Sequence, residues 1–435
     1  MQNKTLLEEY FSPFRIENKN LIAGISPKLH GTEYRLINPQ SIQPRFKGRV
    51  QLEPALNLND FKPSAVIDWM EIGFETEDTF KAKAVKSRLQ ASLNSCNSEV
   101  SVFVTGPERE IGYIGNHFVV KVQEPTPESL KIIIDGIRNE YVLYTVNVPS
   151  IEIRGIEVSV DFYPMWQEDR GDAESSLLRW QMIDVLRKHH FIDPVFSDVF
   201  EDTPRVYAGA KFGETPKLID PNESLGAIND DLVKEVRKLK LKTKELVALH
   251  EKNHRAPEID GTFYVGKRDN EVSFRSMDKV GDKRNATNGT AIELEAKDRR
   301  ARIEVTFQKN GINTYGSPKV IGLDNVEDLK GFKFQTLRKL AFNFYYPTIS
   351  AKEEGRFLSA DSTELTIFSK TGIYGLEEYY RAKYMLEEAR HKRDSSEPEP
   401  KKVRSKGYRL GYDDLNQKIG RALRVLTKKW SLFDV

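Results

Sequence analysis

The sequence predicts an α+β fold, in which a mainly antiparallel sheet has helices packed on one side and a helical region follows at the C-terminus. Two observations lead to this expectation. Between residues 66 and 163, segments with the patterns of strand, helix, strands, helix and strand follow one another. Residues 100–122 have the pattern of a meander of short strands, and residues 261–279 have that of a β-hairpin.

The first half of the chain supplies most of these elements. Residues 66–74 are the first convincing strand, and residues 79–93 follow as a helix rich in lysine and alanine. A second helix is expected to begin at Pro127, because proline is favoured at the first helical position and Thr126 can cap the helix. Its apolar stripe comprises Leu130, Ile133, Ile134 and Ile137. Residues 141–146 are expected to return as a strand.

The strand at residues 151–163, IEIRGIEVSVDFY, has an unusual pattern. Apolar residues alternate with polar ones up to Arg154, and the alternation resumes one residue out of phase after Gly155. Successive side chains of a strand point to opposite faces, so an extra residue is needed to keep both apolar sets on one face. A β-bulge at Gly155 would supply that residue and would direct Glu157, Ser159 and Asp161 to one surface. The alternative is a half-buried strand with a solvated polar face.

The second half begins with a helix at residues 172–189, whose terminal His189 and neighbouring His190 are expected to end the helix rather than to bind a metal, because adjacent helical residues do not share a face. The remaining expected elements are a lysine-rich helix at 229–253, the hairpin at 261–279, a strand at 301–307, mixed signals at 326–346, a strand at 365–368, a helix at 376–391 and an amphipathic helix at 413–430. The last helix could dock on the core, bind DNA or recruit a partner.

These elements suggest five regions. They are an N-terminal extension of irregular structure with short strands at residues 1–63, a core at 64–310, an accessory α/β region at 311–390, a basic linker at 391–408 and a C-terminal region at 409–435 that holds the amphipathic helix.

The composition limits the class of protein. Of the 435 residues, 39% are hydrophobic and 30% charged, which is ordinary for a soluble globular protein. We expect a cytoplasmic protein that makes no membrane contact, since no apolar stretch approaches the length of a membrane span. The single cysteine, Cys96, excludes an intrachain disulfide and a thiolate zinc site. Any metal would therefore be held by oxygen ligands or by the seven histidines.

Two motifs have catalytic counterparts. His250, Glu251 and His254 match H-E-x-x-H, in which two histidines bind zinc and the glutamate activates a water. Because this segment is lysine-rich and lies near a helix end, a zinc hydrolase is only a minor alternative. Tyr380 and Tyr384 lie one helical turn apart, as in some nickases that use two tyrosines. Such spacing is more often explained by packing. The sequence has no Walker-type phosphate loop, which argues against a built-in helicase.

A third set of motifs resembles a known family. In order along the chain stand Arg154, Glu157 and Asp161, then the hairpin with its Tyr-Val-Gly-Lys, then Arg275-Ser-Met-Asp-Lys279, and then Arg302-Ile-Glu304. This order is similar to that of the trans-acting plasmid replication initiators and the gene II replication proteins of filamentous phages. The resemblance covers about residues 66–310 and implies a replication-initiator or relaxase-like fold.

The resemblance also implies a chemistry. Acidic side chains on sheet strands would hold a divalent cation, and a tyrosine would attack a DNA phosphate to leave a 5′-phosphotyrosine and a free 3′-hydroxyl. Hard oxygen ligands favour Mg²⁺ or Mn²⁺. The implied metal ligands are Glu157, Asp161 and Glu304. Because residues four apart on a strand lie about 13 Å apart, we expect Glu304 to act with only one of Glu157 and Asp161.

The resemblance assigns further roles. It places Arg275 and Lys279 in the catalytic site, and Arg154, Lys267 and Arg302 in contact with DNA. Two departures from the family pattern affect the assignment. Gly155 adds a residue between the arginine and the first acid, and Met277 stands where the family has its nucleophilic tyrosine. A thioether cannot carry out phosphoryl transfer, so Tyr264, which the hairpin would place on the face of Met277, is the preferred nucleophile, ahead of Tyr380 and Tyr384.

We therefore expect a replication initiator of a plasmid or filamentous phage that binds origin DNA and nicks one strand for rolling-circle replication. Its expected partners are single-stranded or cruciform origin DNA, a host helicase and a second copy of the chain. The alternative is a non-catalytic origin-binding or copy-control protein with the same fold, an alternative that Met277 favours.

Overall fold

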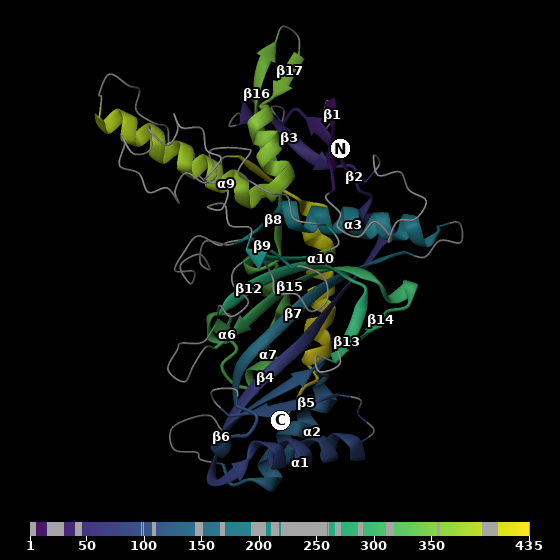
Figure 1. The fold of residues 1–435 in the computed structure, drawn as a ribbon, viewed down its shortest axis with the longest axis vertical. Helices are drawn as coiled ribbons and strands as arrows, with labels where there is room; N and C mark the ends of the chain where they lie inside the picture. Colours follow the sequence, from purple (N-terminus) through teal and green to yellow (C-terminus); the bar gives the residue numbers. More distant parts are fainter. Residues whose placement is uncertain are drawn as a thin grey trace.

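The computed structural model describes residues 6–14, 30–39, 46–96, 98, 100–106, 110–143, 151–165, 170–192, 206–209, 217–218, 259, 261–265, 271–285, 290–309, 317–354, 357–393 and 408–434. Over these residues the chain has the α+β fold predicted from its sequence. The strands form a nine-stranded sheet, a seven-stranded sheet and a separate two-stranded sheet of β13 (Gly281–Asn285) and β14 (Thr290–Glu293) (Figure 1).

All neighbouring strands of the nine-stranded sheet are antiparallel, as predicted. From edge to edge the sheet consists of β10 (Lys217–Leu218), β9 (Val206–Gly209), β11 (Thr262–Val265), β12 (Val272–Lys279), β15 (Arg300–Gln308), β7 (Glu152–Pro164), β4 (Phe61–Lys81), β6 (Ile114–Gln123) and β5 (Val102–Thr105). Three strands, β15, β7 and β4, therefore lie side by side at the centre.

The alternation of residue types gives this sheet two different faces. In β15, Ile303, Val305 and Phe307 are fully buried in an apolar core, while the polar residues between them point to the other face. Four helices contribute apolar side chains to the same core: α1 (Ala82–Ser95), α2 (Pro127–Glu140), α3 (Asp172–His189) and α10 (Asp413–Trp430). These four helices thus pack on one side of the sheet, and the polar side chains of β15 point to the other side.

Two of these helices begin where their sequences indicate. At α2, the Thr126 hydroxyl accepts a hydrogen bond from the Ser129 amide at 3.1 Å, and Pro127 occupies the first turn. Residues 413–430, predicted as an amphipathic helix, form α10, whose apolar face is buried against β4 and a nearby 3₁₀ turn, η9 (Phe334–Thr336). Of the three roles considered for this helix, docking on the core is therefore present.

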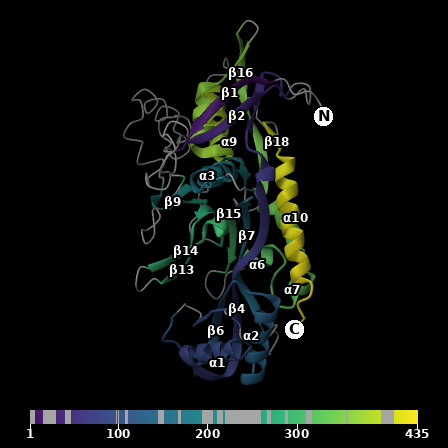
Figure 2. The same cartoon turned by 90° about the vertical axis from the view of Figure 1, so that its right-hand side faces the viewer.

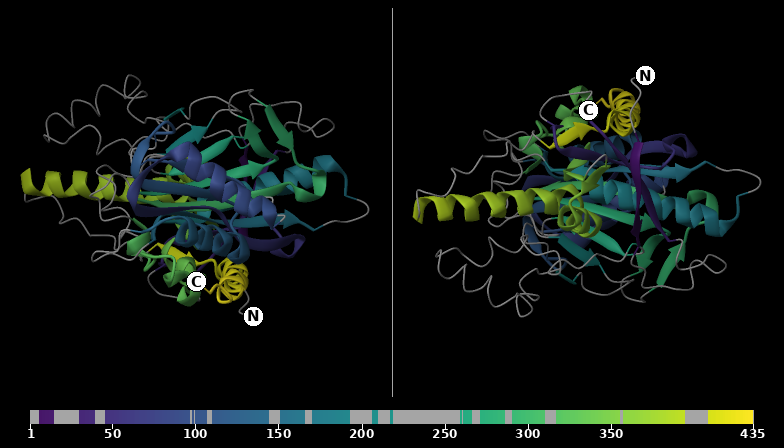
Figure 3. Two further views of the ribbon diagram at one scale, coloured as in Figure 1. Left: turned by 90° about the horizontal axis from the view of Figure 1, so that it is seen from below. Right: turned by 90° about the horizontal axis from the view of Figure 1, so that it is seen from above.

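The seven-stranded sheet lies at the other end of the molecule (Figures 1 and 2). It combines β1 (Leu6–Pro13), β2 (Gly31–Ile37), β3 (Arg49–Pro54), β16 (Asn343–Glu354) and β17 (Phe357–Ala360), and β8 (His190–Phe191) and β18 (Arg409–Gly411) also pair with β16. Helix α9 (Ser362–Arg393) packs on it to form a second apolar core, and the far end of α9 projects from the body (Figure 3). The five-region division stays a prediction, although strands of four predicted regions, all except the linker, share this sheet.

Several local predictions differ from the structure. Residues 365–368, predicted as a strand, lie inside α9, because their apolar side chains face the second core at helical spacing. The strand predicted at 66–74 is part of the longer β4, and the meander predicted at 100–122 contains the two strands β5 and β6. Most of the predicted strand at 141–146, the helix at 229–253, the linker after residue 393 and the hairpin turn fall outside the described residues.

The histidine pair at the end of α3 is buried. His189 Nδ1 is bonded to the Tyr345 carbonyl at 2.8 Å, and His190 Nε2 to the Ala341 carbonyl at 2.7 Å. The two rings thus reach different backbone groups, and α3 ends at His189 as predicted. Burial lowers the pKa of each imidazole from 6.5 to about 4.

This shift predicts acid sensitivity. Below about pH 6.5 both histidines are protonated in the unfolded chain but remain neutral in the folded chain. The free energy of unfolding therefore decreases as the pH falls toward 4, by about 3 kcal/mol for each histidine. Urea unfolding followed by circular dichroism between pH 7 and pH 4 measures this loss. The double variant His189→Asn, His190→Gln keeps an N–H donor at both positions and should flatten the profile. An unchanged profile in this variant would contradict the assignment.

Candidate functional site

A polar surface runs across the three central strands of the nine-stranded sheet. In β7, Glu157, Ser159 and Asp161 all point away from the apolar core, as the sequence predicted. The register places Ser159 opposite Glu304 and Asp161 opposite Arg302 of β15. Cross-strand neighbours lie on the same face, so the acids of β7 and the Arg-x-Glu segment of β15 form one surface.

Two β-bulges shape this surface. In β7, Ile153 pairs with Ile72 and Gly155 pairs with Glu71, so Arg154 is the extra residue. The predicted bulge is therefore present, one residue before Gly155. In β4, the register shifts between Ile67 and Trp69, so Asp68 is the extra residue there. This second bulge turns Asp68 toward the acids of β7 and β15, and it was not predicted.

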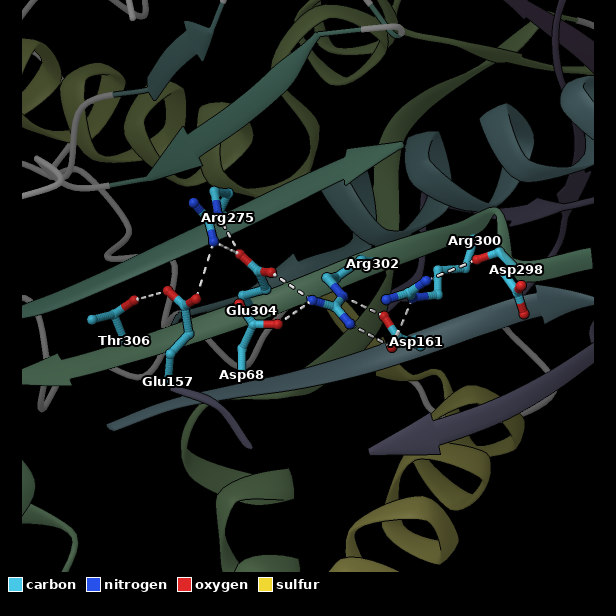
Figure 4. A network of polar contacts seen from close by, with 9 residues as sticks. All are labelled: Asp68, Glu157, Asp161, Arg275, Asp298, Arg300, Arg302, Glu304 and Thr306. Atoms are coloured by element: carbon cyan, nitrogen blue, oxygen red, sulfur yellow. Dashed lines mark hydrogen bonds and ion pairs between the residues drawn. The ribbon is translucent and has the colours of Figure 1, made fainter. Parts of the chain in front are cut away.

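The three carboxylates of Asp68, Glu157 and Glu304 come together at the centre of the surface (Figure 4). Each offers an oxygen, and the three oxygens lie within 4.8 Å of one another. Glu157 and Glu304 are buried, with 4% and 1% of their surfaces exposed, and Asp68 is half-buried. We call these three residues the acidic triad. Each comes from a different strand, so the sheet itself sets the spacing of the oxygens.

Arg275 of β12 bridges two members of the triad. Its guanidinium contacts Glu304 Oε2, and its Nη2 donates to Glu157 Oε1 at 3.1 Å. Thr306 donates to the other oxygen of Glu157 at 2.5 Å. The carboxylate of Glu157 is thereby oriented by one charged and one neutral donor.

Arg302 links the triad to Asp161. Its Nε and Nη2 bind the two oxygens of Asp161 at 2.5 and 2.7 Å, and its Nη1 reaches Asp68 at 2.5 Å and Glu304 at 3.3 Å. Arg300 adds a bond to Asp161 at 3.1 Å. Asp161 therefore lies outside the triad, and two arginines occupy its carboxylate. Of the two expected partners of Glu304, Glu157 is the one that the structure brings to it.

Burial and charge give the triad unequal acidities. Burial raises the pKa of Glu157 to about 7, and the negative charges of Glu304 and Asp68 add to the rise while Arg275 opposes it. For Asp68, burial also raises the pKa, but the positive charges of Arg302, Lys279 and Arg275 together outweigh burial and lower the pKa below its usual value. At neutral pH the triad thus holds one carboxyl close to its midpoint of ionisation.

The triad has the donor chemistry of a divalent-cation site. Three carboxylates supply only hard oxygen ligands, which suit Mg²⁺ or Mn²⁺. Glu157 is difficult to ionise beside two other acids, and a bound cation would relieve this repulsion. The residues that would hold the ion are Asp68, Glu157 and Glu304. A cation would have to replace part of the contact that Arg275 now makes with Glu157 and Glu304.

The predicted nucleophile positions lie on neighbouring strands. Tyr264 of β11 pairs directly with Arg275 of β12, and Met277 is two residues further along the same face of β12. Tyr264 is half-buried. Lys279 lies at the end of β12 opposite Arg300, and its charge acts on Asp68. Tyr264, Arg275 and Lys279 therefore share the polar face with the triad.

The residues assigned to DNA are placed differently. Arg302 is buried with 1% of its surface exposed and is committed to three carboxylates, so we assign it to holding the acids in place. Arg154 at the bulge donates to Glu152 at 2.5 Å. Lys267 and the H-E-x-x-H segment of His250, Glu251 and His254 lie outside the described residues.

The two tyrosines of α9 do not join the triad. The Tyr380 hydroxyl is buried in the second core, where it donates to Glu364 and accepts from Arg49 at 2.6 Å. Burial raises its pKa well above the usual value. Its one-turn neighbour Tyr384 follows on the same helix. Packing explains Tyr380 in this structure.

Comparison with known proteins adds one weak likeness. No family model matches the sequence, and no curated protein matches it. Among solved structures, a rolling circle replication initiator protein from Geobacillus stearothermophilus is similar over 72% of this chain and 98% of its own, with 10% identity and a TM-score of 0.25. At this TM-score the likeness establishes neither a shared fold nor a shared function.

Metal binding tests the triad. We expect isothermal titration with Mn²⁺ at pH 7.5 to give one site, weakened at least about tenfold by Glu157→Gln or Glu304→Gln, since loss of even an outer partner of a metal ligand has such an effect. The affinity should rise from pH 6 to pH 8, because Glu157, with a pKa of about 7, must lose its proton to bind. Glu71→Gln, a buried acid of β4 outside the triad, is the control. No Mn²⁺ binding by the unaltered protein would eliminate the site.

The Asp161 ion pair has a separate, structural consequence. Asp161→Asn should lower the free energy of unfolding by about 3 kcal/mol, because it leaves the buried Arg302 and Arg300 without their main countercharge. Asp135→Asn removes an exposed partner of Lys131 and should change stability by less than about 0.5 kcal/mol. Chemical denaturation measures both. Equal, small effects would show that the network does not contribute to stability.

Proposed function

We propose that this protein is a replication initiator of a plasmid or filamentous phage that binds origin DNA and makes a metal-dependent, tyrosine-mediated nick in one strand. The observation that carries the proposal is the acidic triad, with Arg275 bridging two of its members and Tyr264 on the adjacent strand of the same face. The sequence motifs in the order of the replication initiators support it independently. The weak likeness to a solved structure adds no support.

In this proposal each part of the site has a stated task. Asp68, Glu157 and Glu304 would hold the cation, which would supply Lewis-acid polarisation of the scissile phosphate. Tyr264 is the nucleophile: its hydroxyl oxygen forms a bond to phosphorus, the bond from phosphorus to the 3′ oxygen breaks, and the hydroxyl proton is passed on to the departing oxygen. Arg275, next to Tyr264 and close to the acids, supplies positive charge where negative charge develops.

The remaining assignments follow from the same proposal. Lys279 stands at the end of the polar face and contacts the phosphate backbone, and Arg154 and Lys267 are the outer DNA contacts. The substrate is single-stranded or cruciform origin DNA, and a host helicase and a second copy of the chain are the proposed partners. We propose a cytoplasmic location. In the described part of the chain, every helix is too short or too polar to span a bilayer.

The nicking reaction tests the enzymatic proposal. A supercoiled circle that carries the protein's own gene and its flanking sequence, incubated with Mn²⁺, should give nicked circles with protein attached at the 5′ end. Tyr264→Phe should reduce covalent attachment by about 10³-fold or more, because the phenyl ring lacks the attacking oxygen. Tyr163→Phe, on the same face of β7, is the matched control and should retain activity. Full activity of Tyr264→Phe would exclude this nucleophile.

A second function is favoured by specific observations. Met277 occupies the position of the family's tyrosine, and Arg275 and Arg302 already neutralise the triad without a metal. Both fit a non-catalytic origin-binding or copy-control protein that keeps the acids for stability. In that case the unaltered protein binds origin DNA but does not cleave it with any divalent cation, and Glu304→Gln leaves this binding unchanged.

A further inference from the structure

The solvent face of α10 is a strip of positive charge. Positions buried against the sheet recur at helical spacing, and the positions between them carry basic side chains. The basic residues of this face are Lys418, Arg421, Arg424, Lys428 and Lys429. We call these five residues the basic stripe. The only acids of the helix are Asp413 and Asp414, both in its first turn, so the stripe itself is uniformly positive.

The stripe is available for a ligand. Arg421, Arg424 and Lys428 are exposed, and none of them forms an ion pair with another residue that the structure describes. Lysines and arginines that serve only solubility are usually interspersed with acids. Five cations without an acid between them are instead the electrostatic footprint of a polyanion site.

Neighbouring elements extend this charge beyond the helix. Helix α8 (Leu337–Leu340) packs beside α10 and brings Arg338, whose side chain lies against Gly420. Toward the start of α10, a groove of about 630 Å³ separates the helix from the segment after β3. Lys418 and Arg421 line one wall, Arg35 lines the other, and Tyr346 and Tyr412 stack within it at 4.2 Å. Glu53, which pairs with Arg35, and Asp414 also line the groove and lower the charge at this end, and Glu128 lies near Lys429 at the other end.

The dimensions of the stripe match a nucleic-acid backbone. From Lys418 to Lys429 the helix rises by roughly 16 Å. One strand of a duplex presents a phosphate every 3.4 Å, so roughly five phosphates face a stripe of this length. The number of cations is therefore close to the number of phosphates that they would meet.

The stripe lies on the opposite side of the sheet from the acidic triad. Helix α10 packs on the apolar face of β4, whereas Asp68 of the same strand points to the polar face. Figure 2 shows α10 along one side of the molecule and the β13–β14 hairpin along the other. DNA that contacts the stripe is therefore a different segment from DNA at the triad.

We propose that the basic stripe is a second DNA site, which binds the phosphate backbone of duplex DNA independently of sequence. The inference deepens the proposed function, on which it rests: the triad acts on a single strand, and the stripe holds a flanking duplex on the other face. The stripe would thus raise affinity for origin DNA without taking part in the cleavage.

Charge reversal tests this site. The variant Arg421→Glu, Arg424→Glu, Lys428→Glu changes three exposed side chains, and the control Lys81→Glu, Lys83→Glu, Lys86→Glu makes the same change in net charge at the exposed start of α1. The probes are a fluorescein-labelled 30-base-pair duplex of arbitrary sequence and a 30-nucleotide thymidine strand, followed by anisotropy at several salt concentrations. Circular dichroism verifies that both variants fold.

We expect the stripe variant to bind the duplex at least about tenfold more weakly than the control. The slope of log affinity against log salt should fall by about 3, one for each side chain that no longer neutralises a phosphate. Equal affinity of both variants would overturn the proposal and leave the stripe, with its exposed Val425, to an acidic protein surface. An equal loss for the thymidine strand would overturn the assignment to duplex DNA.

The outcome is separable from that of the proposed function. Nicking of a single-stranded oligonucleotide depends on the triad and should be the same in the stripe variant and in the control. If the unaltered protein never nicks DNA but loses duplex affinity on charge reversal, the stripe is supported and the enzymatic proposal is rejected. If nicking is present and duplex affinity does not respond to charge reversal, the enzymatic proposal remains and the stripe is rejected.

Discussion

The two-bond contact between Arg302 and Asp161 determines how the centre of the molecule is built. Both side chains are buried, so neither charge can be left without its partner. The contact joins β15 to β7, and the third nitrogen of the guanidinium reaches Asp68 across the bulge of β4. A shift of one residue in the pairing of these strands would direct Arg302 into the apolar core. The ion network thus selects one register for three strands.

The same arginines also affect how the triad would bind a cation. Its acids are stabilised by Arg275 and Arg302, and the same acids have the donor set for a divalent cation. The arginines stabilise the site when no ion is bound, since three neighbouring carboxylates, two of them buried, would otherwise repel one another. Their presence also means that a cation gains less than it would in a site built only of acids. The arginines thus lower the affinity of the triad for a cation and raise the stability of the fold without one.

The sequence predicted much of this arrangement and missed one essential part. Alternation in β7 and β15 revealed which side chains share a face, because each strand has one apolar side. The gap in alternation before Gly155 predicted the first bulge. Asp68 was not predicted as a site residue, because its strand is rich in apolar residues and shows little alternation. The one indication of an extra residue was the spacing of three between the buried Ile67 and Met70.

Tertiary context accounts for the other differences. Sequence alone could not distinguish Glu157 from Asp161 as the partner of Glu304, since both point to the same face and only the arginines of β15 separate their roles. Residues 365–368 were predicted as a strand because a short apolar run fits either structure, and the second core selected the helix. Residues 413–430, with a long and strongly periodic pattern, needed no such context.

Strand β16 has a consequence for how the chain acquires this structure. Along its length it pairs successively with β8, β18, β3 and β17, which lie between residues 49 and 411 of the sequence. Its hydrogen bonds to β3 and β8 therefore close very long loops, and such pairings form late in folding. During synthesis on the ribosome, β3 can pair with β16 only after most of the chain has emerged. A nascent chain of this protein consequently exposes an unpaired strand edge for most of its synthesis, and protection of that edge by a chaperone would favour its yield.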